Sequence, residues 1–190
     1  EFIDKRKELT FNKPIIQGIV NCQGDHFAVS ANEFIDFPYA AIQAGNHYAS
    51  TPANACTGII EKNTISYSKD YLGSKNDCTL MDSGAIYLFT RCDDIIIRDN
   101  TIKNYTGKAG NRGIFCDDGA KNISIYRNTI EVLDGNDAIC LWYPEHVGEY
   151  VNDFCENNVV MNNTFINCKY TFEQKPGSNS INKGNKIVVK

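Results

Sequence analysis

The stretch IIIRDNTI, residues 95–102, returns as ISIYRNTI at residues 123–130, and this repetition decides the fold. Related segments, each with an Asn two residues before an Ile or Phe, occur at residues 28–34, 59–65, 159–165 and 182–187. Their central residues are Asn32, Asn63, Asn100, Asn128, Asn163 and Asn185, separated by 31, 37, 28, 35 and 22 residues. Intervals of this length are typical of stacked repeat architectures.

The residues that lead into each Asn follow the pattern of a short β-strand. In the first five copies an apolar residue stands three positions before the Asn: Val29, Ile60, Ile97, Ile125 and Val160. A strand with one buried face therefore enters each bend in the same register. The copy at Asn185 lacks this apolar residue, so we expect a terminal variant.

A second set of aligned segments follows the first five Asn copies. They are AAIQAG (40–45), GAIYLF (84–89), GIFCDD (113–118), AICLWY (138–143) and TFEQKP (171–176). Each repeat thus holds two or three short strands joined by turns, without helical periodicity, which predicts a solenoid. The alternative is an antiparallel sandwich of unrelated hairpins, which would favour shorter loops at closer intervals.

The recurring Asn has a physical reason in a solenoid. At a tight bend Asn tolerates left-handed backbone angles, and its amide can hydrogen-bond the equivalent Asn one coil away. We therefore predict that Asn100, Asn128 and Asn163 form a buried ladder along one bend.

Composition limits the classes of protein. The chain has 190 residues, a formal net charge of −4 and 42% hydrophobic residues, which fits one globular domain over residues 1–190. Its basic residues are dispersed and no apolar run reaches membrane-spanning length, so nucleic acid and a membrane span are not expected. The opening EFIDKRKELTF has no export signal, and we expect a segment of a longer chain.

The cysteines do not form a zinc-binding pattern. Eight are scattered without Cys-x-x-Cys pairs: Cys22, Cys56, Cys78, Cys92, Cys116, Cys140, Cys155 and Cys168. We expect buried structural thiols, with one or two disulfides as the alternative in a secreted protein.

The segments DSGAIYLF (82–89) and GIFCDDGAKNISIYRNTI (113–130), with the repeated NTI bends, resemble right-handed parallel β-helix proteins of the pectin-lyase-like superfamily. The resemblance covers roughly Phe27–Val189. It implies an all-β, right-handed parallel β-helix with little or no α-helix. The Asn bends predict about five to six coils. Because solenoids generally need polar terminal covers, we expect further domains or chains over the ends.

The same resemblance implies a function and a location. Within that superfamily the two segments look like those of secreted carbohydrate-active proteins, many of them glycoside hydrolases, which act on polysaccharides or oligosaccharides without a cofactor. We therefore expect a secreted, cell-surface or periplasmic protein. Two alternatives share the fold: glycan-binding spikes or adhesins without catalysis, and uronate lyases that use Ca²⁺.

Alignment of the second set of strands places chosen side chains on one outward face. Taking Ile42, Ile86, Ile114, Ile139 and Phe172 as inward, alternation directs Tyr87, Phe115, Asp117 and Trp142 outward. Aromatic rings stack on pyranose faces and carboxylates accept hydrogen bonds from hydroxyls, so this face could bind sugar. Trp142 could instead lie covered by the insertion that follows it. In this insertion His146 is either a substrate-binding residue that can act as acid or base, or a plain surface residue.

Cleavage of a glycosidic bond generally needs two carboxyl groups about 5–9.5 Å apart. Asp117 is the first candidate, and its partner is Asp82, one coil earlier, or Glu173, two coils later; Asp118 is a further candidate at the following bend. The competing interpretation makes Asp117 and Asp118 solvated turn acids.

For the lyase alternative, the candidate Ca²⁺ ligands and basic residues can also be named. The oxygens would come from Asp93, Asp94, Asp117 and Asp118, and the base would be Arg91, Arg112 or Lys175. Asp93 and Asp94 align with a bend, which favours a structural role for both. We therefore predict no metal site for the hydrolase.

Overall fold

The structure is a computed structural model of the chain. It describes residues 2–3, 19–37, 39–45, 56–68, 83–89, 92–105, 112–117, 119–132, 137–141, 155–168 and 179–190. These residues form strands and bends, and none of them is helical. The expected absence of α-helix is confirmed for this part of the chain.

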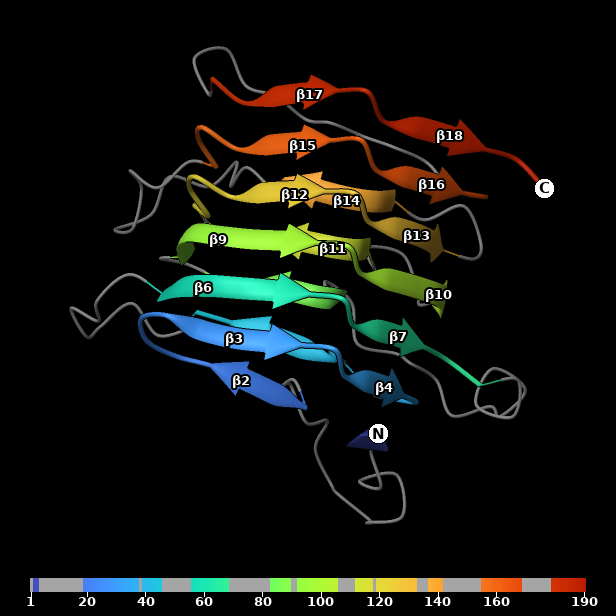
Figure 1. Ribbon diagram of the computed structural model, residues 1–190, viewed down its shortest axis with the longest axis horizontal. Helices are drawn as coiled ribbons and strands as arrows, with labels where there is room; N and C mark the ends of the chain where they lie inside the picture. The colour runs from blue at the N-terminus through green and yellow to red at the C-terminus, as the bar shows by residue number, and fades with distance from the viewer. Residues whose placement is uncertain are drawn as a thin grey trace.

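The strands form three sheets (Figure 1). Sheet A contains β1 (Phe2–Ile3), β4 (Glu33–Ile35), β7 (Thr64–Ser66), β10 (Thr101–Tyr105), β13 (Thr129–Val132), β16 (Thr164–Ile166) and β18 (Lys186–Val188). Sheet B contains β2 (Val20–Cys22), β5 (Ile42–Ala44), β8 (Gly84–Leu88), β11 (Arg112–Cys116) and β14 (Asp137–Leu141). Sheet C contains β3 (Phe27–Ser30), β6 (Cys56–Glu61), β9 (Cys92–Arg98), β12 (Ser124–Tyr126), β15 (Val159–Met161) and β17 (Ile181–Lys183).

The chain visits the sheets in the fixed order B, C, A and climbs by one strand at each return. Five coils contribute a strand to every sheet, and β17 and β18 belong to a sixth coil. In Figure 1 the chain crosses the front from left to right, returns behind from right to left and rises, which makes the solenoid right-handed. Every strand pair among the described residues is parallel, so the antiparallel sandwich is excluded.

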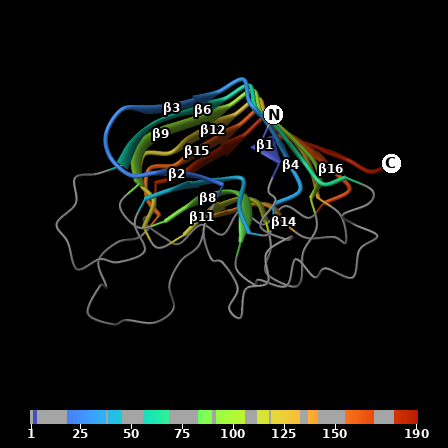
Figure 2. The same ribbon diagram turned by 90° about the horizontal axis from the view of Figure 1, so that it is seen from below.

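The core lies between the three sheets, which enclose it on three sides (Figure 2). Residues in equivalent positions of successive coils stack there as columns. One column from sheet A contains Phe34, Ile65, Ile102, Ile130 and Phe165, and one from sheet B contains Ile42, Ile86, Ile114 and Ile139. All of these side chains are buried, which confirms the inward assignment of the four isoleucines.

The predicted Asn ladder is present and runs through all six coils. The Asn128 Oδ1 accepts hydrogen bonds from the backbone N–H and the Nδ2 of Asn100, both at 3.0 Å. In turn the Asn128 Nδ2 donates to the Asn163 Oδ1 and to the Ile97 carbonyl, each at 3.0 Å. The same pattern joins Asn32, Asn63, Asn100, Asn128, Asn163 and Asn185. In the first five copies the apolar residue three positions before the Asn places its side chain in the core, and its carbonyl accepts a hydrogen bond from the ladder Asn of the next coil.

The backbone at this bend differs from the expectation. The left-handed φ belongs to the residue immediately before each ladder Asn and not to the Asn itself. These residues are Ala31, Lys62, Asp99, Arg127, Asn162 and Gly184, with φ between 55° and 68°. The Asn is therefore selected for its amide group, while the preceding residue carries the bend whatever its type.

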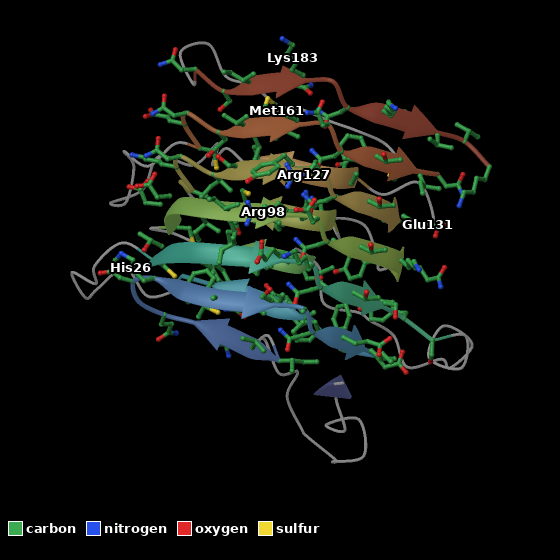
Figure 3. All side chains as sticks on the ribbon, in the orientation of Figure 1. His26, Arg98, Arg127, Glu131, Met161 and Lys183 are labelled. Atoms are coloured by element: carbon green, nitrogen blue, oxygen red, sulfur yellow. The ribbon has the colours of Figure 1, made fainter. Side chains whose placement is uncertain are left out.

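The outer face of sheet C carries long side chains in register, two of them charged. Arg98, Tyr126, Met161 and Lys183 occupy equivalent positions in β9, β12, β15 and β17, and Figure 3 shows the labelled members one above another. The Arg98 guanidinium is 2.7 Å from the Glu61 carboxylate on the preceding coil. At the neighbouring bend Arg127 donates two hydrogen bonds of 2.7 Å to Asp99. Sheet C lies opposite sheet B, so these pairs are remote from the outer face of sheet B (Figure 2).

The last coil is more exposed than those before it. Its apolar side chains include Ile187, which is 62% exposed, although Ile187 continues the buried column that ends at Phe165. Solenoids generally need a cover over such terminal coils. The structure shows no cover over the described residues of β17 and β18.

Candidate functional site

The outer face of sheet B carries side chains that stack in columns from coil to coil. Register pairs Gln43, Tyr87, Phe115 and Cys140 across β5, β8, β11 and β14, as the sequence alignment predicted. A backbone hydrogen bond of 2.8 Å from the Asp117 N–H to the Leu88 carbonyl extends the same register past the end of β11. Asp117 therefore stands one coil above Phe89, at the carboxyl end of its strand.

Small side chains let two consecutive residues point inward in each strand of this sheet. Ala41, Ala85, Gly113 and Ala138 face the core directly before the inward isoleucines. A Cβ added to Gly113 would lie 2.5 Å from the Ile130 Cγ2 and 2.7 Å from the Ala138 carbonyl oxygen. Strict alternation fails here, and the residue before the small one, Arg112 in β11, faces outward.

Four aromatic rings form one cluster on this outer face. The ring of Tyr87 is at its centre, with centroids 4.1 Å from Phe89, 5.1 Å from Phe115 and 5.6 Å from Tyr39. Tyr87 and Phe115 are each only 2% exposed. Both rings thus lie on the outer face that alternation predicted, but they are buried there, and sugar binding by them stays a prediction. Alternation identified the face they lie on, but not whether that face is covered.

Asp117 lies at the border of this cluster and is partly exposed. The Tyr87 hydroxyl donates a hydrogen bond of 2.5 Å to its Oδ2. Burial of the phenol, followed by the negative charge of Asp117, raises the pKa of Tyr87 far above its usual range. Tyr87 therefore keeps its proton and acts as a donor, which orients the carboxylate.

Two partly exposed charged residues, Arg112 and Asp137, begin β11 and β14 and so lie at the end of the strands opposite to Asp117. They are register partners in β11 and β14, and the Arg112 guanidinium carbon lies 4.4 Å above the centre of the Phe115 ring. Asp117 lies five positions after Arg112 in the chain, so their Cα atoms are about 16 Å apart along the strand. Asp137 was not among the predicted residues; its place before the small residue Ala138, equivalent to that of Arg112 before Gly113, is the signal that could have found it.

Most other predicted site residues lie outside the described residues. These are the candidate acids Asp82, Asp118 and Glu173, the candidate sugar ligands Trp142 and His146, and the candidate bases Arg91 and Lys175. Of the predicted site, the structure thus brings together Asp117, Tyr87 and Phe115. The second carboxylate that hydrolysis requires stays a prediction.

The two acids considered as Ca²⁺ ligands elsewhere, Asp93 and Asp94, lie within β9 and not at a bend between strands, so the expected bend position is wrong; they stand where the register between β6 and β9 shifts. Asp94 has a left-handed φ of 51°, and the Asp93 Oδ1 accepts a hydrogen bond of 2.7 Å from the Asn122 Nδ2 on the next coil. In the part of the chain that the structure describes, no three His, Cys, Asp or Glu side chains gather as metal ligands would. The same part contains no helix long and apolar enough to cross a membrane.

Comparisons of the chain with protein-family models, with curated proteins and with solved structures found no match. The fold and the site described above therefore rest on the sequence and the structure of this chain alone.

Proposed function

We propose that the protein is a carbohydrate-active β-helix of the pectin-lyase-like superfamily that hydrolyses glycosidic bonds of a polysaccharide or oligosaccharide. The observation that carries this proposal is the Asp117 carboxylate, held by the Tyr87 hydroxyl at 2.5 Å at the border of an aromatic cluster. The parallel coils and the GIFCDDG segment that contains Asp117 support the superfamily. A secreted or cell-surface location belongs to the same proposal.

The chemistry assigns different tasks to the two residues. Asp117, because it accepts the hydrogen bond from Tyr87, suits the carboxylate task, which is to activate water or to attack the anomeric carbon. Tyr87 is a positioning residue that fixes the direction of this carboxylate. The acid that protonates the leaving oxygen would be Asp82, Asp118 or Glu173. Sugar must reach Asp117 from its exposed side, because Tyr87 and Phe115 are buried.

The test uses purified protein and a panel of neutral and uronate-containing polysaccharides, with new reducing ends as the measure of cleavage. Asp117→Asn should retain sugar binding and lower turnover about a thousandfold or more, because the lost charge acts in the transition state. Asp99→Asn is the matched control, since Asp99 pairs with Arg127 away from sheet B. It should leave turnover unchanged.

The Tyr87→Phe variant tests whether Tyr87 acts by orienting the Asp117 carboxylate. The variant keeps the ring in the cluster and removes only the donor to Asp117. We expect turnover to fall about tenfold with little change in KM, because the carboxylate is present but less well oriented. An equal loss in kcat and in sugar affinity would indicate damage to the fold instead.

Three outcomes would contradict the proposal in different ways. Unchanged turnover in Asp117→Asn would remove Asp117 from the mechanism. Sugar binding by the wild-type protein without any cleavage would replace hydrolysis by a glycan-binding function. Products that absorb in the ultraviolet through a new C=C bond would identify a lyase.

A further inference from the structure

Two cysteines face each other across adjacent coils. Cys56 begins β6 and Cys92 begins β9, and the two residues are register partners in sheet C. Neighbouring parallel strands place partner Cα atoms about 4.8 Å apart, within the range of about 4.4–6.8 Å that a disulfide spans. No other two of the described cysteines are register partners across strands.

Cys56 is surrounded by hydrogen-bonding groups. As a thiol, its Sγ donates to the Cys22 carbonyl at 3.3 Å. As a thiolate, it accepts hydrogen bonds from the Cys92 thiol and from the backbone amides of Gly24 and Gly45, and these lower the pKa of Cys56 to about 6 against the effect of its burial. The thiolate is the nucleophilic form of cysteine.

The neighbouring thiols are held in the protonated form. The hydrogen bond to Cys56 and burial raise the pKa of Cys92 well above its ordinary value. Burial raises the pKa of Cys22 to about 11 and that of Cys116 well above the usual range. The pair is thus asymmetric, with one nucleophilic sulfur and one protonated sulfur next to it.

We propose that Cys56 and Cys92 are a redox-reactive pair in which Cys56 is the residue that peroxide oxidises and Cys92 is the residue that resolves it into a disulfide. The bond joins the second coil to the third. This site is separate from the proposed sugar site, because it lies in sheet C inside the solenoid.

The reaction balances with hydrogen peroxide as the oxidant. The Cys56 thiolate attacks one peroxide oxygen, the O–O bond breaks, and Cys56 sulfenic acid forms while the departing hydroxide takes up a proton to give water. The Cys92 sulfur then attacks the Cys56 sulfur, the S–O bond breaks, and the leaving hydroxide takes the Cys92 proton. Two thiols lose two electrons in total, and one peroxide becomes two waters.

Both sulfurs lie in the interior, at 3% exposure for Cys56 and 1% for Cys92. Their reaction therefore calls for a small oxidant, and peroxide is close to water in size. A protein oxidant would need the coil to open, and the bond would then form more slowly than with peroxide.

The experiment treats the folded protein with hydrogen peroxide, blocks remaining thiols in denaturant and counts them by mass. The reduced chain has 8 cysteines, and the expected result is the loss of two free thiols. Cleavage before aspartate separates Cys22 from Cys56, because Asp25 and Asp36 lie between them. The disulfide-linked peptides should contain Cys56 and Cys92.

The variants provide the controls. Cys56→Ser and Cys92→Ser should each abolish the loss of two thiols, whereas Cys140→Ser should retain it. Peptide mapping of the wild-type protein tests the pair even if a variant does not fold. Retention of all thiols, or a disulfide through Cys22 or Cys116 in place of Cys56 or Cys92, would overturn the proposal.

Discussion

Replacement of Asn128 by Leu tests the ladder at its centre. Asn128 is 1% exposed, and its Oδ1 accepts two hydrogen bonds, from the backbone N–H and from the Nδ2 of Asn100. Leu fills a similar volume but offers no acceptor. Two buried donors of Asn100 therefore lose this partner, and the Ile97 carbonyl loses the donor that Asn128 supplies.

The expected cost follows from these losses. A buried polar group without a partner costs about 1–3 kcal/mol, so two unsatisfied donors cost roughly 2–6 kcal/mol. A typical domain has a total stability of about 5–15 kcal/mol. The variant should therefore lose a large part of its free energy of unfolding.

Asn32→Leu is the matched control, because it makes the same substitution at the first rung. The hydrogen bonds of the Asn32 side chain are donated to the Ser30 carbonyl and to the Asn63 Oδ1, and the Asn32 backbone N–H still donates to that Oδ1 after the change. No donor is left without an acceptor, so the cost should be below about 1 kcal/mol.

The assay is urea unfolding of the wild type and both variants, with amide exchange as a local measure. Asn128→Leu should lower the urea midpoint by at least about 0.7 M, given a cost of at least about 2 kcal/mol and a slope of about 1–3 kcal/mol per M. The Asn100 amide should exchange faster in Asn128→Leu and not in Asn32→Leu. Equal midpoints for the two variants would refute this reasoning, because the Asn128 side chain accepts two hydrogen bonds from buried donors and the Asn32 side chain only donates.

Two further predictions concern packing and charge. Gly113→Ala should lower the free energy of unfolding in urea by about 1–3 kcal/mol, because the Cβ of the new alanine would lie 2.5 Å from the Ile130 Cγ2. An unchanged midpoint would show that the packing around Gly113 can accommodate a methyl group. The hydrogen bond from Arg127 lowers the pKa of Asp99, so its stabilisation should be present above the ordinary value of about 3.9 and lost as pH falls through the lowered value. The difference in midpoint between wild type and Arg127→Ala should therefore shrink below about pH 4, and a constant difference would contradict the ion pair.

Much of the fold could be predicted because the ladder imposes a register that the sequence records. Each coil must present an amide at the same bend, so Asn100 and Asn128 recur with an apolar residue three positions earlier. The left-handed residue was misplaced because Asn tolerates that conformation, whereas the bend forces it on Asp99 and Arg127, which have other side chains. Asn is favoured both at left-handed positions and as a partner in the ladder, so the sequence does not show which of the two selects it. The backbone angles show that the ladder does.

The candidate site could be predicted less completely. Alternation correctly paired Tyr87 with Phe115 and placed Asp117 after them, because side-chain direction is a local property of a strand. Burial of the rings is a property of whatever covers the sheet, which alternation does not record. Asp137 escaped because strict alternation fails at the small residues, where two consecutive side chains point inward.

A carbohydrate site at Asp117 can be tested by titrating the protein with neutral and uronate-containing oligosaccharides and following the amide chemical shifts. A binding oligosaccharide should shift the amide signals of Asp117 and its neighbours at the end of β11 and leave those of the strands of sheets A and C unchanged. Asp117→Asn should alter these shifts, and Asp99→Asn should not. Shifts confined to sheets A or C, or none at saturating sugar, would contradict a carbohydrate site at this edge of sheet B.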